Sequence, residues 1–498
     1  MIKINEISTK TERPVKILQF GEGNFLRAFI DWQVDIANEK TDFNGSIVIA
    51  QPLAQGMADF INDQNGIYTT VLRGIENGKM IKEYRKITSV KTCINVYKDF
   101  TSYIKYAECD TLRFIVSNTT EAGISYEKGC SLTDEPPVSY PAKITQFLYK
   151  RFNAFNGAIN KGIIFIPCEL IEANGENLKR IVLQYANEWN LSKEFISWIN
   201  EACNFTNTLV DRIVTGYPRK TADELCEELG YKDNLLDTAE RFHLFVIESD
   251  GDLEALKKEL PLEQAGCNVI WTHDQSFYRT RKVRILNGAH TLFVPTAFLY
   301  GLTSVSESLE NETVYTFLKK GLFEEIIPSL DGDKQALEDY AAAVLERFAN
   351  PYLEHQLLSI SLNSVSKFKV RDLTSVLAYY KKFNKAPKTL AYGLAALITF
   401  YNGKDVANRE MTGSRNGEAY PIKDDEAVLK AFETLYSKNN YKDAKGREAI
   451  VNSVLERTDW WGLDLSTLEG FKEAVLSSYN SIAEEGIVKS LKAYTKTK

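Results

Sequence analysis

The sequence predicts a two-domain α/β protein, with a parallel sheet wrapped by helices first and a mostly α-helical domain second. Short apolar runs alternate with helical patterns up to about residue 280, and helical periodicity dominates beyond it. Strands that alternate with helices imply a parallel sheet, because parallel strands need a crossover connection. A chain of 498 residues is also too long for one ordinary core. We therefore expect domains at 1–278 and 279–498.

Individual segments follow from apolar runs and their periodicity. Buried strands are expected at 15–20, 46–50, 112–117, 162–167, 244–247 and 268–271. Helices between these strands are expected at 24–38, 142–155 and 177–189. Helices of the second domain are expected at 288–300, 333–348, 373–383, 389–401 and 425–436. The hydrophilic stretch 402–425 is expected to be a long exposed loop.

Composition excludes several classes of protein. A net charge of -7, from 60 basic and 67 acidic residues, gives no reason to expect a nucleic acid or anionic membrane partner. Seven scattered cysteines without C-x-x-C favour reduced thiols and a cytoplasmic protein. The first fifteen residues lack the apolar core of a signal peptide, and the longest apolar run, near 390–401, is a buried helix rather than a membrane span. The oligomeric state stays open, and a monomer is compatible with the sequence.

A glycine loop follows the first predicted strand, in the sequence QFGEGNFLRAF from Gln19 to Phe29. Gly21 permits a tight turn, and Gly23 leaves space for a pyrophosphate at the N-terminus of the next helix. The loop therefore indicates a Rossmann-type dinucleotide-binding domain, with an ordinary strand-to-helix turn as the alternative. Leu26 replaces the third glycine of the usual fingerprint, so we expect the helix to pack less tightly on the sheet.

The second strand lacks the acid that usually binds the ribose hydroxyl groups of NAD. Gln51 and Pro52 follow this strand, and Asp59 is too far along the chain to assign. No arginine stands there for the 2′-phosphate of NADP either. The local sequence therefore supports NAD over NADP only weakly.

A second constellation, Lys282, Asn287 and His290, stands among apolar residues in RKVRILNGAHTL. A helix would place Asn287 and His290 on one face. Reduction of a ketone by hydride needs a proton donor and hydrogen bonds to the developing alkoxide, which a lysine, an asparagine and a histidine provide without a metal. Each residue also has a structural alternative. Lys282 could belong to a solvated basic edge, Asn287 could form a turn, and His290 could be a histidine of the core.

The string K-x-R-x-x-N-G-x-H, from Lys282 to His290, resembles the signature of the polyol-specific long-chain dehydrogenases, which include mannitol 2-dehydrogenase. The resemblance implies that Lys282 is the general acid/base and that Asn287 and His290 position the substrate oxygen. It also implies NAD as the cofactor. The glycine loop and the string SNTTEAGISY at 117–126 resemble the family's cofactor loops, which implies that the cofactor-binding residues are Phe20, Gly21, Gly23, Asn24, Phe25, Asn118 and Thr119.

Other strings, PCELIEANG and LVDRIVTGYPR, resemble the branch of this family that acts on sugar acids. Polyol-specific members have an asparagine where this chain has Leu170, which counts against a mannitol-type activity. Asn174 is a candidate to replace that hydrogen-bond donor. Lower-ranked candidates are two acids that would adjust the pKa of Lys282 and two cationic groups that would bind a substrate carboxylate. These residues are Glu121, Asp211, His355 and Lys367, with structural caps, ion pairs or solvated charges as the alternative.

The sequence thus predicts an NAD-dependent reductase of a small keto sugar acid. A fructuronate reductase or a mannitol-type dehydrogenase is the nearest alternative. A methyltransferase also places Gly-x-Gly after its first strand, but it has no use for Lys282, Asn287 and His290 together. A binding protein that kept the fold without catalysis is the third alternative.

Overall fold

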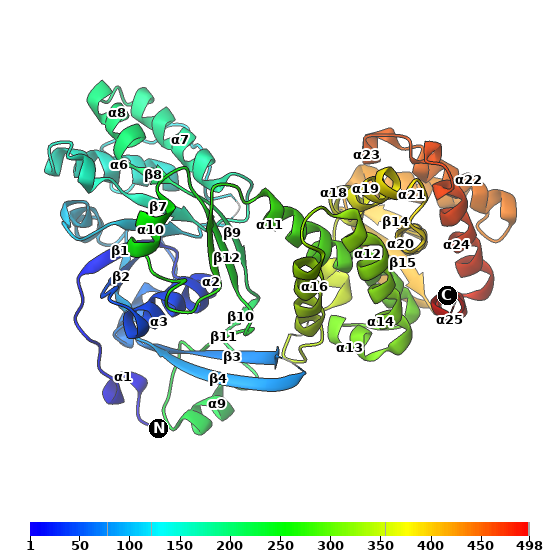
Figure 1. Cartoon of the computed structure of the whole chain (residues 1–498), viewed down its shortest axis with the longest axis horizontal. Helices are drawn as coiled ribbons and strands as arrows, with labels where there is room; N and C mark the ends of the chain where they lie inside the picture. The colour runs from blue at the N-terminus through cyan, green and yellow to red at the C-terminus, as the bar shows by residue number, and fades with distance from the viewer. Residues whose placement is uncertain (77, 121, 354, 497–498) are drawn as a thin grey trace. The chain divides into compact units, whose positions relative to one another are not determined.

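The structure is a computed structural model that describes residues 1–76, 78–120, 122–353 and 355–496. It divides into two compact units, Met1–Ser276 and Phe277–Lys498, whose elements are labelled in Figure 1. The sequence places the boundary between the domains two residues later, between 278 and 279.

The first unit is built on a six-stranded parallel sheet (Figure 1). Its order, β5-β2-β1-β6-β7-β8, is the 3-2-1-4-5-6 order of the Rossmann fold when the strands are counted along the chain. The strands are β1 (Val15–Phe20), β2 (Ser46–Gln51), β5 (Val90–Asn95), β6 (Phe114–Ser117), β7 (Ile164–Pro167) and β8 (Asn204–Phe205). The predicted α/β class with a Rossmann-type first domain is confirmed, and the two edge strands β5 and β8 are additions to the predicted set.

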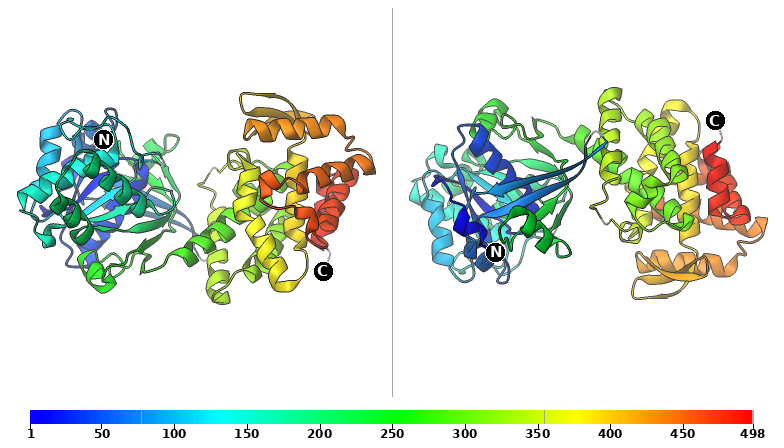
Figure 2. Two further views of the ribbon diagram at one scale, coloured as in Figure 1. Left: turned by 90° about the horizontal axis from the view of Figure 1, so that it is seen from above. Right: turned by 90° about the horizontal axis from the view of Figure 1, so that it is seen from below.

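Helices lie on both faces of this sheet (Figure 2). One apolar core is buried on each face. Successive residues of β1 point to opposite faces, so Ile17 packs into one core and Leu18 into the other. The first core is covered by α2 (Asn24–Leu26), the π-helix η1 (Arg27–Asp31), α3 (Trp32–Lys40), α4 (Ala58–Asp63) and α10 (Leu253–Glu259). The second is covered by α5 (Phe100–Ile104), η2 (Lys105–Glu108), α6 (Tyr140–Ala154), α7 (Asn174–Glu188) and α8 (Lys193–Ala202).

Two smaller sheets complete the first unit. One has the order β10-β11-β3-β4 and consists of β3 (Tyr68–Glu76), β4 (Lys79–Ile87), β10 (Val214–Gly216) and β11 (Asp237–Ala239). The other has the order β13-β12-β9 and consists of β9 (Asn207–Asp211), β12 (Leu244–Glu248) and β13 (Val269–Thr272). The runs predicted at 244–247 and 268–271 are therefore strands, but they lie outside the main sheet, and β12 pairs antiparallel with β9. The remaining elements are α1 (Ile4–Ile7), η3 (Ile159–Lys161) and α9 (Ala222–Leu229).

The second unit is mostly helical, as predicted. A continuous helical stretch runs through α11 (Ser276–Arg281), the π-helix η4 (Lys282–Asn287) and α12 (Gly288–Tyr300). The helices that follow are α13 (Val305–Glu310), α14 (Glu312–Lys319), η5 (Lys320–Ile326), α15 (Ile327–Ser329), α16 (Lys334–Phe348), α17 (Leu357–Ile360), α18 (Ser364–Arg371), α19 (Leu373–Phe383) and α20 (Lys388–Phe400). The C-terminal helices are α21 (Glu426–Lys438), α22 (Ala444–Leu455), α23 (Thr458–Trp461), η6 (Leu465–Thr467), α24 (Phe471–Glu485) and α25 (Ile487–Lys496).

The expectation of a long loop at 402–425 is wrong. The segment forms a three-stranded antiparallel sheet of β14 (Gly403–Ala407), β15 (Glu410–Arg415) and β16 (Glu418–Lys423), which lies beside α21 (Figure 2). Its two tight turns contain Asn408 and Asn416, both at positive φ, as hairpin turns require. One face is buried through Met411 and Ile422, and the exposed alternate residues give the segment its hydrophilic composition.

The apolar run near residue 390 is a buried helix, as expected. It forms α20, whose side chains are almost all buried within the second unit. Among the residues that the structure describes, no helix has the length and apolar character needed to cross a membrane.

Candidate functional site

The glycine loop after β1 has the geometry that the sequence predicts. Gly21 has a φ of 119°, which strongly favours glycine, and its N–H donates to the carbonyl of Ala50 at 3.3 Å. A Cβ atom on Gly21 would lie 2.9 Å from the carbonyl oxygen of Asn118, so a side chain is excluded there. Gly23 precedes the first residue of α2, and a Cβ atom on it would meet no protein atom within 4 Å. The helix N-terminus is therefore open to a phosphate group.

Leu26 stands in the helix after the loop, where the usual fingerprint has its third glycine. The Leu26 side chain is buried in the core, and its Cδ1 atom would lie 3.3 Å from a Cβ atom on Gly21. Phe20 likewise faces the core, where its ring packs against Tyr103 and Tyr140. Phe20 therefore anchors the loop, and its side chain does not line the open space.

Arg27 fixes the side chain of Asn24 at the start of the helix. Its guanidinium donates to Asn24 Oδ1 at 2.6 Å and to the carbonyl of Leu235 at 2.9 Å, and it pairs with Asp237 at 3.6 Å. Burial raises the pKa of Asp237 to about 7, against the opposing charge of Arg27. Asn24 itself is exposed at the helix N-terminus. The buried ion pair thus orients an amide at the predicted pyrophosphate position.

The loop after β6 is held by a buried carboxylate. Glu169 accepts from the N–H and hydroxyl of Thr119, both at 2.9 Å, and from the hydroxyl of Ser117 at 3.1 Å. Burial raises the pKa of Glu169 despite these hydrogen bonds, which lower it. Asn118 donates to the carbonyl of Cys168 at 2.7 Å. These contacts position Asn118 and Thr119 at the carboxyl ends of β6 and β7, the edge where Rossmann folds bind ligands.

An apolar cavity of about 470 Å³ lies at this edge. Leu170 is 63% exposed there, although it is a large apolar residue. Phe25 stacks on Phe29, with ring centroids 5.0 Å apart, and forms another part of the wall. The lining residues are Phe25, Asn118, Thr120, Ala122, Glu169, Leu170 and Val210. The wall of this cavity is mostly apolar with a few polar groups, as in many small-molecule sites.

Asn174 does not supply the missing hydrogen-bond donor near Leu170. Its amide nitrogen lies 3.0 Å from the carbonyl of Pro167, 3.1 Å from that of Glu169 and 3.4 Å from that of Thr208. The side chain is fully buried. Because backbone carbonyls take both N–H groups, Asn174 joins the start of α7 to two strands and has none left for a substrate.

Lys282 and Asn287 are the first and last residues of the π-helix η4. In an α-helix, positions five apart lie roughly 140° apart around the axis. A π-helix closes an i→i+5 hydrogen bond, so these two positions are one turn apart. The π-helix therefore brings Lys282 toward the side of Asn287, and both side chains are partly exposed. His290 follows in α12, so the three predicted catalytic residues share one continuous helical stretch.

His290 is 6% exposed, and its ring stacks on Phe348 with ring centroids 4.1 Å apart. Its Nε2 atom is buried, and none of the residues that the structure describes forms a hydrogen bond with it. Burial lowers the pKa of His290 well below its usual value, and the charges of His355 and Arg371 lower it further. The imidazole is therefore neutral at physiological pH, with one ring nitrogen unused by the protein.

A cationic cluster surrounds His290 within the second unit. His355 lies edge-on to His290, with ring centroids 5.4 Å apart. Lys367 donates to the carbonyl of Ile360 at 2.7 Å, and burial lowers its pKa to about 8. Arg371, which the sequence analysis did not select, donates to Thr291 at 3.2 Å. The pKa of His355 is lowered by burial, so the cations beside His290 are Lys367 and Arg371, and we define these two residues as the cationic cluster.

Asp211, one of the two candidate acids, is not part of these groups. Asp211 is buried at the end of β9, opposite Leu244 of β12. Glu121 lies outside the described residues. In the described ranges, no group of three or more histidine, cysteine, aspartate or glutamate side chains is arranged to hold a metal ion.

The fold and these residues define a class of protein: a Rossmann-type dinucleotide-binding unit followed by a helical unit with a Lys-Asn-His set. Residues 15–262 match the mannitol dehydrogenase Rossmann domain, and residues 274–483 match the mannitol dehydrogenase C-terminal domain. The chain belongs to the mannitol dehydrogenase family, and the predicted resemblance is confirmed.

Similar proteins include altronate oxidoreductases from Escherichia coli O1:K1 and Shigella flexneri. Both are 46% identical, over 476 and 475 residues respectively, which cover 95% of this chain and 95% of each relative. Among solved structures, a substrate-free D-sorbitol dehydrogenase has a TM-score of 0.77 at 23% identity and covers 99% of this chain and 100% of its own. A Pseudomonas fluorescens mannitol 2-dehydrogenase, solved with NAD and D-mannitol, has a TM-score of 0.67 at 20% identity, with coverages of 99% and 96%. These two structures share the fold of this chain.

Proposed function

We propose that the protein is a tagaturonate reductase (altronate oxidoreductase) that interconverts D-tagaturonate and D-altronate with NADH and NAD. The similarity to altronate oxidoreductases over 95% of the chain is the observation that carries the proposal. The cationic cluster supports a carboxylate-bearing substrate, because a sugar acid needs a cationic partner that a neutral polyol does not.

The residues of the first unit fit a nicotinamide dinucleotide. Gly21, Gly23 and Asn24 would hold its pyrophosphate at the N-terminus of α2, and the apolar wall with Phe25 and Leu170 would hold its nicotinamide ring. NADH supplies a hydride when bound.

In this proposal Lys282 transfers the proton, and Asn287 and His290 stabilise the charge that develops on the substrate oxygen. As a hydride adds to the keto carbon, the π electrons of the C=O bond move to oxygen, and the Lys282 ammonium gives that oxygen a proton. In the reverse direction, neutral Lys282 removes the proton from the hydroxyl group. Asn287 and His290 donate hydrogen bonds to the oxygen while it carries negative charge. The unpartnered and neutral Nε2 of His290 suits this role, because it loses no protein contact when it donates.

Arg371 and Lys367 would bind the carboxylate of the sugar acid. Both are partly buried cations, so their attraction for an anion is screened less than that of a fully exposed side chain. Both cations act electrostatically on His290, which supports a carboxylate site close to the proposed site of the substrate oxygen.

A direct test compares tagaturonate, fructuronate and fructose as substrates for NADH oxidation, followed at 340 nm. We expect kcat/KM to be highest with tagaturonate and lowest with fructose. Highest activity with fructuronate would make the protein a fructuronate reductase, and highest activity with fructose would make it a mannitol-type dehydrogenase. Absence of NADH binding, with binding of an adenosyl methyl donor, would instead indicate a methyltransferase.

We also propose that the protein acts in the cytoplasm. All seven cysteines are free, and six of them are buried, which suits a reducing compartment. Fractionation of the source cells with an antibody against the chain tests this, and recovery outside the cytoplasm would contradict it.

A further inference from the structure

The carboxyl end of β2 lacks an acid of its own. Gln51 is its last residue, and its side chain is used within the protein: Nε2 donates to the carbonyl of Leu53 at 2.7 Å, and Oε1 accepts from Ala58 N at 2.9 Å. In dinucleotide-binding Rossmann folds an acid near this point accepts hydrogen bonds from the adenosine ribose. The structure therefore has to provide this acceptor from another segment.

Glu22 brings a carboxylate to this place from the glycine loop. It stands between Gly21 and Gly23, and it accepts a hydrogen bond from the backbone N–H of Met57 in the segment that follows β2. A Cβ atom on Gly56 would overlap Glu22 Oε1 and would lie 2.5 Å from Cδ of Gln51. The Glu22 carboxylate is thus packed against the backbone just beyond the end of β2, and only a glycine at position 56 allows this approach.

Partial burial strengthens the electrostatic interactions of the Glu22 carboxylate with nearby groups. The residue is partly buried, and burial raises the pKa of its carboxyl, while Arg27 and two backbone N–H groups oppose that change. Arg27 is itself bonded to Asn24 and paired with Asp237, and Glu22 forms no salt bridge within the described part of the chain. A carboxylate in a partly desolvated position discriminates strongly between a neutral and an anionic group.

We propose that Glu22 is the residue that selects NAD over NADP. Its carboxylate accepts hydrogen bonds from the 2′- and 3′-hydroxyl groups of the adenosine ribose and repels a 2′-phosphate. Gly56 is a positioning residue that allows Glu22 to reach the end of β2. This assignment rests on the proposed dinucleotide-dependent function and adds the origin of its nucleotide preference, which the end of the second strand does not explain.

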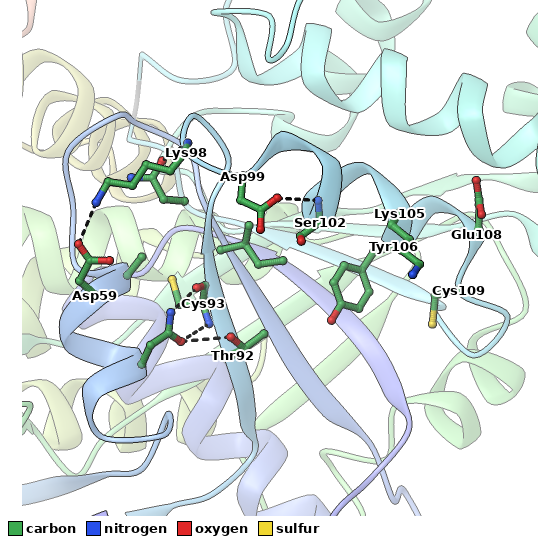
Figure 3. Close-up of a pocket in the computed structure, with 14 residues that line it drawn as sticks. Asp59, Thr92, Cys93, Lys98, Asp99, Ser102, Lys105, Tyr106, Glu108 and Cys109 are labelled. Carbon is green, nitrogen blue, oxygen red and sulfur yellow. Dashed lines mark hydrogen bonds and ion pairs between the residues drawn. The ribbon is translucent and has the colours of Figure 1, made fainter.

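Asp59 is the alternative acid, and its geometry disfavours it. Its side chain is 77% exposed and is paired with Lys98 at 2.9 Å. Figure 3 shows this ion pair at a cavity of about 750 Å³ that runs beside β5 and α5. None of the glycine-loop residues lines that cavity. Asp59 therefore serves as a matched control, since it is a carboxylate from the segment after β2 that does not meet the glycine loop.

The test measures binding of NADH and NADPH to the whole protein by nucleotide fluorescence, without substrate. It compares the wild type, Glu22→Gln, Gly56→Ala and Asp59→Asn. We expect the wild type to bind NADH more tightly than NADPH. Glu22→Gln should reduce the ratio of the NADH affinity to the NADPH affinity roughly tenfold or more, because it removes the negative charge. Gly56→Ala should reduce the ratio in the same direction while leaving every charge in place, because its Cβ displaces the carboxylate. Asp59→Asn should leave the ratio unchanged.

Competition with 5′-AMP and 2′,5′-ADP locates the effect on the ribose. We expect Glu22→Gln to improve binding of 2′,5′-ADP relative to 5′-AMP. If both Glu22→Gln and Gly56→Ala keep the wild-type ratio while still binding NADH, the assignment of Glu22 is overturned and the proposed function stands. An equal shift in Asp59→Asn would also overturn it. If the folded wild type binds neither nucleotide, the proposed function itself fails.

Discussion

The imidazole of His290 stacks on the phenyl ring of Phe348, with ring centroids 4.1 Å apart and an angle of 27° between the planes. The contact buries the imidazole and fixes its plane, and burial keeps its pKa well below the usual value. A neutral ring with a fixed direction can donate one hydrogen bond without titrating in the range where the enzyme works. Phe348 therefore acts as a positioning residue for His290, although it has no polar atom that could bind a substrate oxygen.

Replacement of His290 should reduce catalysis through the loss of one hydrogen-bond donor. We expect His290→Ala to lower kcat about 100-fold to 1000-fold, the usual loss for one donor to a developing oxyanion. Because the wild-type ring stays neutral, the pH profile of kcat should keep its shape in the variant. A profile in which an inflection between pH 5 and 8 disappears with His290 would contradict this. Phe348→Leu, the control, should lower kcat less, since it loosens the ring without removing it.

Replacement of Lys282 should remove the proton donor while leaving cofactor binding intact. We expect Lys282→Ala to lower kcat by about 100-fold to 10,000-fold, the range for general acid–base catalysis. The dissociation constant of NADH, measured by fluorescence, should stay near the wild-type value. Added primary amines should restore part of the rate in this variant and leave the wild type unaffected. Wild-type turnover by Lys282→Ala would indicate that another group moves the proton.

Substrate binding should weaken at alkaline pH. The pKa of Lys367 is lowered to about 8, chiefly by burial, so its positive charge is complete below that value and is lost as the pH rises through it. The KM for a sugar acid should therefore increase above about pH 8, while binding of NADH should not follow the same curve. Lys367→Met should have a raised KM that no longer shows this step. Lys369→Met, on the same helix, is the matched control, and an equal effect there would argue against a specific role for Lys367.

A packing contact of helix α12, which carries His290, should contribute to the stability of the folded protein. Leu292 of α12 meets two glycines, because a Cβ atom on Gly321 would overlap its side chain and one on Gly393 would lie 2.5 Å from its Cδ1. We expect Gly393→Ala to lower the free energy of unfolding by about 1–3 kcal/mol, as overpacking does in other cores. In a Leu292→Ala background the same change should cost less, because the clash is gone. Chemical denaturation of the wild type and the three variants of this cycle measures the difference, and strict additivity would show that the contact is not the cause.

The first half of the chain was predictable because its signals are local. The strand at 15–20, Gly21 and the helix after Gly23 follow from apolar runs, a required turn and a helix start, each within a few residues. The separate pairing of 244–247 and 268–271 could not be seen in this way. These strands have the same apolar composition as the strands of the main sheet, and only their partners in space distinguish them.

The hairpins at 403–423 were missed because charged residues on the exposed face hid the alternation. Met411 and Ile422 are buried on the other face, and Asn416-Gly417 was a usable turn signal. Sequence spacing also gave no sign of the π-helix that places Lys282 one turn from Asn287. Two functional candidates were likewise invisible to spacing. Arg371 is recognisable only from its place beside His290, and Glu22 only from its contact with the segment after β2.

The division of the chain at Ser276 and Phe277 has an evolutionary consequence. The residues that we assign to nucleotide selection precede this point, and those that we assign to the sugar acid follow it. A single genetic crossover near codon 276 would thus transfer the nucleotide preference without the substrate preference, or the reverse. A new substrate specificity could then arise by divergence of the C-terminal unit alone, while the nucleotide cofactor stays the same.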